Sequence, residues 1–167
     1  MRWSLSFERV IPMLVLALGA ALVPVVIHAV SNPNPSSSQA VPWQSSQVVT
    51  PQALAKDLAL PKEKRPVIVC VGFKFLYQGG HIPGALYKGP AREASGLEEL
   101  MAWAHSIPKD TPVVIYCGCC PFTKCPNVRP AFEALRTAGL THIQVLDLEH
   151  SFEKDWMLSG FPTQKQQ

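Results

Sequence analysis

The sequence carries little charge, and neither sign dominates. Charged residues make up 16% of its 167 positions, and 15 Lys and Arg against 12 Asp and Glu leave a net charge of +3. The basic residues form no run or stripe of the kind that binds a phosphate backbone, so we expect no nucleic-acid partner. No internal repeat is visible, and the length suits one domain of ordinary size.

Cysteine is scarce everywhere except in one stretch. Four of the five cysteines lie in "YCGCCPFTKCPNVRPA", residues 116–131, at Cys117, Cys119, Cys120 and Cys125. Such crowding in a chain otherwise poor in cysteine points to thiol chemistry, a metal site or structural disulfides.

Formal charge is absent from residues 10–30, which follow Arg2 and Arg9. A basic start before an apolar run is typical of an export signal, and the run is close to the ~20 residues that span a bilayer. We therefore expect residues 1–30 to be a signal peptide or an N-terminal membrane anchor, with residues 10–30 as a membrane tether if the segment is retained. Either outcome places the remainder outside the cytoplasm, in the periplasm or another extracytoplasmic space.

Regular apolar periodicity is missing from residues 31–47, which are rich in Ser, Pro, Asn and Gln. This composition is typical of a flexible linker. We expect the globular domain to occupy residues 48–163 and a polar tail to occupy residues 164–167.

Within the domain, apolar runs alternate with amphipathic segments. Thr50 before Pro51 is a typical helix start, and Gly139 is a typical helix stop. Helices are predicted at residues 51–58, 95–106, 128–139 and 151–160, and buried strands at residues 66–73, 111–117 and 142–148. Strands that alternate with helices in this way predict an α/β fold, an open parallel sheet with helices on both faces.

The predicted topology gives Cys117 a special position, because this residue ends a strand. In an open parallel sheet, ligands bind beyond the carboxyl ends of the strands. A helix is expected to begin about ten residues later, so loop N–H groups and the helix N-terminus would form a cradle that favours an anion. Such a cradle stabilises a thiolate, the reactive form of cysteine.

Several motifs resemble the rhodanese-like domain family over residues 48–162. The resemblance rests on "GGHIPGALY" (residues 79–87), "VVIYC" (113–117), "RPAFEALRTAGLTHIQVLDL" (129–148) and a closing Trp-x-x-x-Gly-x-Pro (156–162). It implies the rhodanese-like α/β fold. It also implies a cysteine that accepts a sulfane sulfur as a persulfide, as in the thiosulfate sulfurtransferases, although the family includes inactive binding modules too.

The sequence departs from this family pattern near the expected site. Family members often carry Asp-x-Arg where this chain has Cys70, Val71 and Gly72. The family's loop is short, whereas here Cys117 precedes Arg129 by twelve residues. The insertion holds the other three loop cysteines.

Three interpretations of the loop cysteines remain open. Structural disulfides are favoured by an oxidising compartment. Thiol redox chemistry or sulfur transfer is favoured by the closeness of several thiols. In the metal interpretation, thiolates would hold Zn²⁺ or Cu(I), with these candidate ligands: Cys117, Cys119, Cys120 and Cys125.

The predicted function is sulfane-sulfur transfer, or related thiol redox chemistry, by an exported rhodanese-like protein without a cofactor. Its partners would be a small-molecule sulfur donor and a thiol acceptor. The alternative function is a non-catalytic module that binds a soft metal ion or a protein partner through the cysteine-rich loop.

Each candidate residue has an expected role. Cys117 is the expected nucleophile, and Arg129 is the expected anion-binding group. Cys125 is an alternative nucleophile or a resolving thiol, because a helix capped by Asn127 would begin beside it and lower its pKa. The remaining candidates for resolution or disulfide formation are Cys119, Cys120 and Cys70. For Cys70 we also consider the simpler role of a small buried core residue.

The uncharged run at residues 10–30 gives a testable prediction about location. Cells that express the full-length chain should contain the domain outside the cytoplasm, either free or attached to a membrane. Fractionation with markers for each compartment measures this, and recovery of the full-length protein with the cytoplasmic marker would contradict it.

Overall fold

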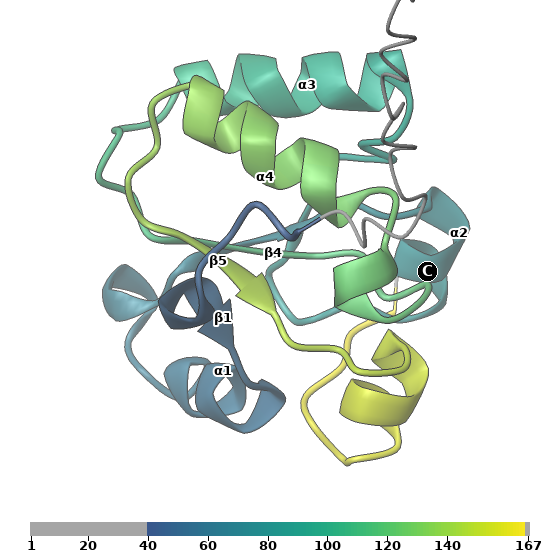
Figure 1. Ribbon diagram of the computed structural model, residues 1–167. Helices are drawn as coiled ribbons and strands as arrows, with labels where there is room; N and C mark the ends of the chain where they lie inside the picture. The colour runs from purple at the N-terminus through teal and green to yellow at the C-terminus, as the bar shows by residue number, and fades with distance from the viewer. Residues whose placement is uncertain (1–39, 166–167) are drawn as a thin grey trace, which may run out of the picture. The chain divides into compact units, whose positions relative to one another are not determined.

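A five-stranded parallel sheet forms the centre of the computed structural model, which describes residues 40–165 (Figure 1). The strand order is β1-β5-β4-β2-β3. The strands are β1 Val48–Val49, β2 Val67–Cys70, β3 Leu86–Tyr87, β4 Val113–Tyr116 and β5 Ile143–Leu146. All four neighbouring pairs are parallel, which confirms the predicted sheet.

Helices cover both faces of the sheet, as predicted (Figure 1). The longer helices are α1 Pro51–Asp57, α2 Lys74–Gly79, α3 Ala94–His105 and α4 Val128–Thr137. The short turns are η1 Ser45–Gln47, η2 Lys62–Lys64, η3 Phe122–Lys124 and the π-helical η4 Glu153–Met157. Helices α3 and α4 pack on one face, while α1, α2 and η4 pack on the other.

The helix boundaries follow the signals in the sequence. The Thr50 side chain accepts a hydrogen bond from the Ala53 N–H, and Pro51 occupies the first turn of α1. Gly139 follows α4 with a φ of 91°, a left-handed conformation that glycine adopts without strain. Strands β1 and β3 and helix α2 were not predicted, because β1 and β3 have two residues each and α2 buries none of its residues.

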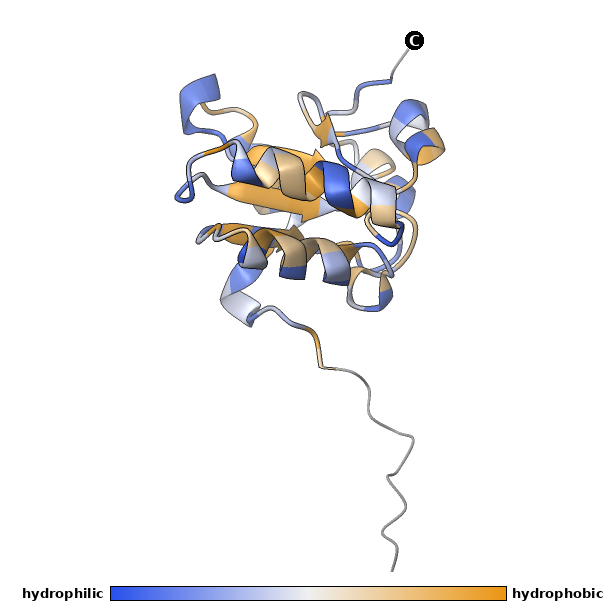
Figure 2. Cartoon of the chain, turned by 90° about the horizontal axis from the view of Figure 1, so that it is seen from above, coloured by the Kyte–Doolittle hydropathy of each residue, from blue (hydrophilic) through white to orange (hydrophobic). Residues whose placement is uncertain are grey.

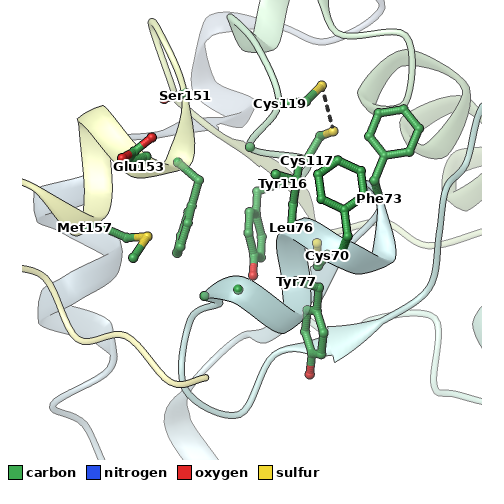
Figure 3. Close-up of a pocket in the computed structure, with 15 residues that line it drawn as sticks. Cys70, Phe73, Leu76, Tyr77, Tyr116, Cys117, Cys119, Ser151, Glu153 and Met157 are labelled. Carbon is green, nitrogen blue, oxygen red and sulfur yellow. Dashed lines mark hydrogen bonds between the residues drawn. The ribbon is translucent and has the colours of Figure 1, made fainter. Parts of the chain in front are cut away.

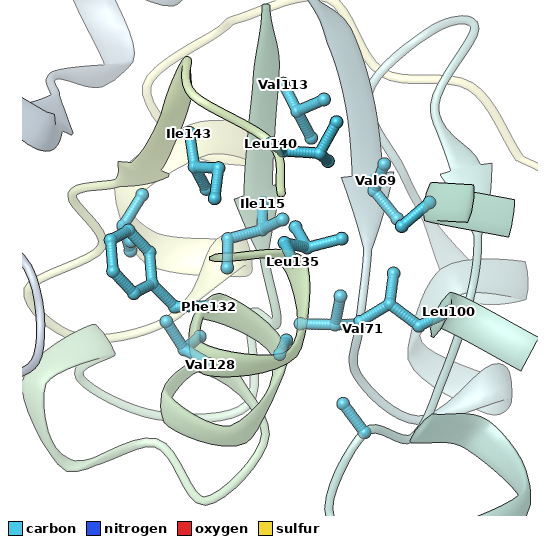
Figure 4. Packing of buried hydrophobic residues seen from close by; sticks show 14 of the residues in the cluster. Val69, Val71, Leu100, Val113, Ile115, Val128, Phe132, Leu135, Leu140 and Ile143 are labelled. Atoms are coloured by element: carbon cyan, nitrogen blue, oxygen red, sulfur yellow. The ribbon is translucent and has the colours of Figure 1, made fainter. Parts of the chain in front are cut away.

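Two apolar clusters, one on each face of the sheet, make up the core. Neighbouring strand residues alternate between them: Val69 and Ile115 join the cluster under α3 and α4, whereas Ile68 and Val114 join the other. Figure 4 shows the first cluster, and Figure 2 shows the apolar strands lying between helices whose outer surfaces are more hydrophilic. Burial on both faces explains why these strands are continuous apolar runs.

The folded domain begins before the boundary predicted at Val48. Trp43, inside the predicted linker, is only 6% exposed, and its ring packs against Phe122 and Phe132 at centroid distances of 5.9 and 5.6 Å. A buried tryptophan of this kind ties residues 40–47 to the core. The part of the predicted linker before Ala40 lies outside the described residues.

The predicted polar tail also takes part in the fold. The backbone of Gln164 exchanges two hydrogen bonds with that of His81, at 2.9 and 2.8 Å. No helix within residues 40–165 is long and apolar enough to cross a membrane. The signal peptide or anchor predicted at residues 1–30 lies outside the described residues.

The packing of Trp43 predicts a large stability effect. Trp43→Ala should lower the free energy of unfolding by about 3–5 kcal/mol, because it removes a buried ring and leaves a cavity. Urea unfolding of the full chain measures this. Val41→Ala, at a 36% exposed position two residues away, is the matched control and should change stability by less than ~0.5 kcal/mol. Equal effects of the two substitutions would contradict the packing role.

Candidate active site

Cys117 lies at the carboxyl end of β4, as the sequence predicted. Strands β2 and β4 pair with Cys70 opposite Tyr116. Because side chains alternate along a strand, Cys70 and Tyr116 face one side of the sheet and Cys117 faces the other. Cys117 accordingly joins the core cluster under α3 and α4, where it is buried.

Two glycines make room for the Cys117 thiol and its backbone. A Cβ atom on Gly72 would lie 2.8 Å from the Cys117 sulfur and 2.6 Å from its carbonyl oxygen, which is too close for any side chain. Gly118 has a φ of 86°, and a Cβ there would lie 2.6 Å from Cβ of Phe152. Neither Gly72, which lies beside Cys117 in space, nor Gly118, which follows it in the chain, carries a side chain. The backbone can therefore pass close to Cys117 and take a left-handed conformation directly after it.

The four loop sulfurs gather around Cys119. Its sulfur lies 3.2 Å from that of Cys117, 3.1 Å from that of Cys120 and 3.8 Å from that of Cys125. The sulfurs of Cys117, Cys119 and Cys125 all lie within 4.8 Å of one another. The structure therefore brings together the four residues that sequence analysis singled out, and all of them are free thiols.

Asn127 contributes to the site in a way that the sequence did not predict. Its position before α4 is that of an N-cap, but its side chain makes no capping hydrogen bond. Instead, its buried amide donates a hydrogen bond of 3.3 Å to the Cys117 sulfur and accepts one of 3.0 Å from the Arg92 N–H. Asn127 thus fixes Cys117 relative to the segment before α3.

The neighbours of Cys125 lower the pKa of its thiol. The nearby Cys117 and Cys119 thiols hold the pKa of Cys125 well below the ordinary value of a cysteine, and the N–H groups of Asn127 and Val128 at the start of α4 add to this. The same contacts act in the opposite direction on the pKa of Cys119, which is raised.

The pKa of the Cys117 thiol is also raised. Its hydrogen bond to Cys119 lowers this pKa, but the hydrogen bond to Cys125 and burial together outweigh that effect. These directions make Cys125 the most acidic thiol of the cluster and disfavour the thiolate at Cys117.

Cys70 lies apart from the sulfur cluster, in the core on the opposite face of the sheet. It is 1% exposed, and burial raises the pKa of its thiol to about 11. A direct disulfide between Cys70 and Cys117 would need backbone movement, because their side chains leave the sheet on opposite faces. The resolving role of Cys70 remains a prediction from the sequence, beside its alternative role as a buried core thiol.

Arg129 lies in the first turn of α4, where one nitrogen of its guanidinium donates a hydrogen bond of 2.7 Å to the Ala40 carbonyl. It is not among the residues that line the cavity described next. The anion-binding role of Arg129 remains a prediction from the sequence.

A cavity of about 530 Å³ opens beside Cys117 and Cys119 (Figure 3). Its wall is mostly apolar and comes from Cys70 at the end of β2, α2 and the residue before it, the end of β4, and the segment around η4. The apolar side chains include Phe73, Phe75, Leu76, Phe152 and Met157. Neither Cys120 nor Cys125 lines the cavity, so Cys117 and Cys119 are the loop thiols that face it.

Comparison with known proteins identifies the fold. The sequence profile of the Rhodanese-like domain matches residues 50–154. No curated protein sequence matches the chain at a significant level.

Several solved structures are similar to this chain. The rhodanese-like domain of the Alr3790 protein from Anabaena sp. is 24% identical, with a TM-score of 0.52, over 72% of this chain and 80% of that one. The BH2092 protein from Bacillus halodurans is 18% identical, with a TM-score of 0.56, over 72% and 77%. YnjE is 25% identical, with a TM-score of 0.53, over 72% of this chain and 31% of that one.

The charge distribution in the sulfur cluster predicts one thiolate at neutral pH. The reduced protein should show the ultraviolet absorbance of one thiolate at pH 7, and this absorbance should be lost as the pH falls through the lowered pKa of Cys125. Cys125→Ser should remove it at pH 7. Cys70→Ser is the control and should leave it unchanged, because the raised pKa of Cys70 keeps that thiol protonated. Unchanged absorbance in Cys125→Ser would contradict the assignment.

Proposed function

The chain belongs to the rhodanese-like domain family, and from this premise we propose that it transfers sulfane sulfur, or carries out related thiol redox chemistry, through a persulfide on Cys117. The observation that carries this proposal is the placement of the Cys117 thiol. It lies at the ligand-binding edge of a parallel sheet and faces a cavity, and a second thiol lies 3.2 Å away.

The first step loads sulfur onto Cys117. The Cys117 thiol loses its proton to solvent water, and the resulting Cys117 thiolate attacks the sulfane sulfur of the donor. A new S–S bond forms at Cys117, the bond between the sulfane sulfur and the rest of the donor breaks, and the donor residue leaves with the electron pair. The Asn127 amide, 3.3 Å from the Cys117 sulfur, can donate a hydrogen bond to the anion at that position.

Two fates of the persulfide fit the geometry. An external thiolate that attacks the outer sulfur becomes a persulfide itself and returns Cys117 as a thiolate, which completes sulfur transfer. A Cys119 thiolate that attacks the inner sulfur forms a Cys117–Cys119 disulfide and releases hydrosulfide. The second fate is a redox reaction, and the 3.2 Å separation of these sulfurs supports it.

Soft-metal binding is a second candidate function, favoured by one observation. The sulfurs of Cys117, Cys119 and Cys125 lie within 4.8 Å of one another, and thiolates around a Zn²⁺ or Cu(I) ion lie roughly 3.8 Å apart. The 3.8 Å between Cys119 and Cys125 already fits this spacing, whereas the Cys117–Cys119 pair would have to open from 3.2 Å. Sulfur transfer needs no such rearrangement, so we place it first.

The location of this chemistry is also a proposal. The uncharged run at residues 10–30 supports action outside the cytoplasm. Neighbouring thiols tend to form disulfides in an oxidising compartment. A dithiol reductant would there be needed to return a Cys117–Cys119 disulfide to thiols, whereas transfer of the outer sulfur to an external thiolate needs none.

Single-cysteine substitutions test the proposed function. Cys117→Ser should form no persulfide and should lower sulfur transfer about 10³-fold or more, because the nucleophile is lost. Cys119→Ser should still form the persulfide but should lose the internal disulfide. Sulfur transfer from several donors, persulfide detection by mass spectrometry and the metal content of the same preparations are the measurements.

The control is Cys70→Ser, which changes a thiol that lines the cavity but lies outside the sulfur cluster, and which should still form the persulfide. If Cys125→Ser abolished the persulfide while Cys117→Ser kept it, the nucleophile would be Cys125. A wild type that forms no persulfide with any donor, and that holds a stoichiometric metal ion lost in Cys125→Ser, would overturn sulfur transfer in favour of metal binding.

A further inference from the structure

The cavity beside Cys117 has an unusual lining for a site that would receive a small inorganic anion. Its wall is built largely from aromatic and aliphatic side chains, among them Phe75 and Phe152. Phe73 lies on one side of the cavity and Met157 on another (Figure 3). Phe75 is 68% exposed, so a large apolar surface is left open at this cavity. Exposed aromatic surface around a concave site is typical of a surface that a ligand covers.

The charge of the cavity also disfavours a small dianion. None of its lining residues is Lys, Arg or His, and the only formally charged side chain among them is Glu153. The guanidinium of Arg92 lies over the ring of Phe73 at 5.7 Å but does not line the cavity. Thiosulfate carries two negative charges, and a wall of this kind offers it no cationic partner to offset the loss of its hydration.

We propose that the cavity binds the organic part of the sulfur donor, and that the preferred donor carries its sulfane sulfur on an apolar group about the size of an aromatic ring. This proposal rests on the proposed function, because it names the substrate class for the same site. The donor group would lie among Phe75, Phe152 and Met157, with its sulfane sulfur directed at Cys117.

The size of the cavity fits this donor class. A volume of about 530 Å³ lies within the range of pockets that bind small organic molecules. A phenyl group buried there would cover apolar surface that a methyl group cannot reach. Because a single methylene in an apolar pocket changes specificity by roughly tenfold or more, we expect at least about a tenfold preference for phenyl over methyl.

The chemical step is the loading step already described, with a specified leaving group. An organic thiosulfonate donates its terminal sulfur to the Cys117 thiolate, an S–S bond forms, and the S–S bond of the donor breaks. The electron pair leaves on the organic sulfinate. Charge and electrons balance without any additional oxidant or reductant.

Two donors that differ only in the organic group provide the kinetic test. Benzenethiosulfonate and methanethiosulfonate carry the same single negative charge and the same sulfane sulfur. The kcat/KM of the full chain with each donor is divided by that donor's rate with free cysteine, which removes the difference in intrinsic reactivity. The corrected phenyl-to-methyl ratio should be about ten or more, and thiosulfate should be the poorest of the three donors.

Substitutions in the wall identify the cavity as the source of this preference. Phe75→Ala and Met157→Ala should each lower kcat/KM for benzenethiosulfonate several-fold more than kcat/KM for methanethiosulfonate, and so should lower the corrected ratio several-fold. Leu158→Ala is the matched control: Leu158 follows Met157 in the chain and is 76% exposed, but it does not line the cavity. Because Phe75 is largely exposed, its substitution tests the proposal without threatening the fold.

A binding measurement separates this proposal from the proposed function. Benzenesulfonate and methanesulfonate have no sulfane sulfur, and their affinities can be compared by chemical-shift titration of the wild type and of Phe75→Ala. Tighter binding of benzenesulfonate that Phe75→Ala weakens supports the proposal even if no donor yields a persulfide, in which case sulfur transfer alone fails. Equal affinities, or a phenyl preference that survives both wall substitutions, would overturn it.

Discussion

The parallel pairing of β2 with β4 is the constraint on which the site depends. It sets Cys70 opposite Tyr116, the last residue of β4, so Cys117, which follows the strand directly, must emerge on the other face of the sheet. It also brings Gly72 against Cys117, at a distance that permits only a glycine. A shift of one residue in this register would exchange the faces of Cys117 and Tyr116 and would dismantle the sulfur cluster.

The thiols of the sulfur cluster shift one another's pKa in opposite directions. The thiolate form is most favoured at Cys125, because two neighbouring thiols and two N–H groups at the start of α4 lower the pKa of that residue. Cys117 faces the cavity but remains neutral until it loses a proton. The most acidic thiol, Cys125, and the thiol that faces the cavity, Cys117, are therefore different residues. The fold and the loop spacing alone do not show which thiol has which property.

The sequence predicted features that arise from continuous patterns and missed those that arise from single contacts. The strands around Val69, Ile115 and Val145 are buried on both faces, so each is an apolar run that can be recognised directly. The position of Cys117 follows from the end of one such run. By contrast, the amide of Asn127 reaches Cys117 rather than the helix end. The cavity wall uses Phe73, which the sequence placed in a buried strand, and Phe75 from α2, which was not predicted. Such roles depend on the direction of a side chain in three dimensions, which the order of residues does not specify.

The contact between Trp43 and Phe122 has a consequence for how the chain can vary. Phe122 belongs to η3, the turn inside the cysteine-rich loop, so the segment before β1 supports the loop from outside the sheet. The hydrogen bond from Arg129 to the Ala40 carbonyl adds a second tie between the same two parts. Insertions or deletions between Ala40 and Val48 would therefore be transmitted to the thiols. This short segment should tolerate changes in length as poorly as the strands do, even though its composition is that of a linker.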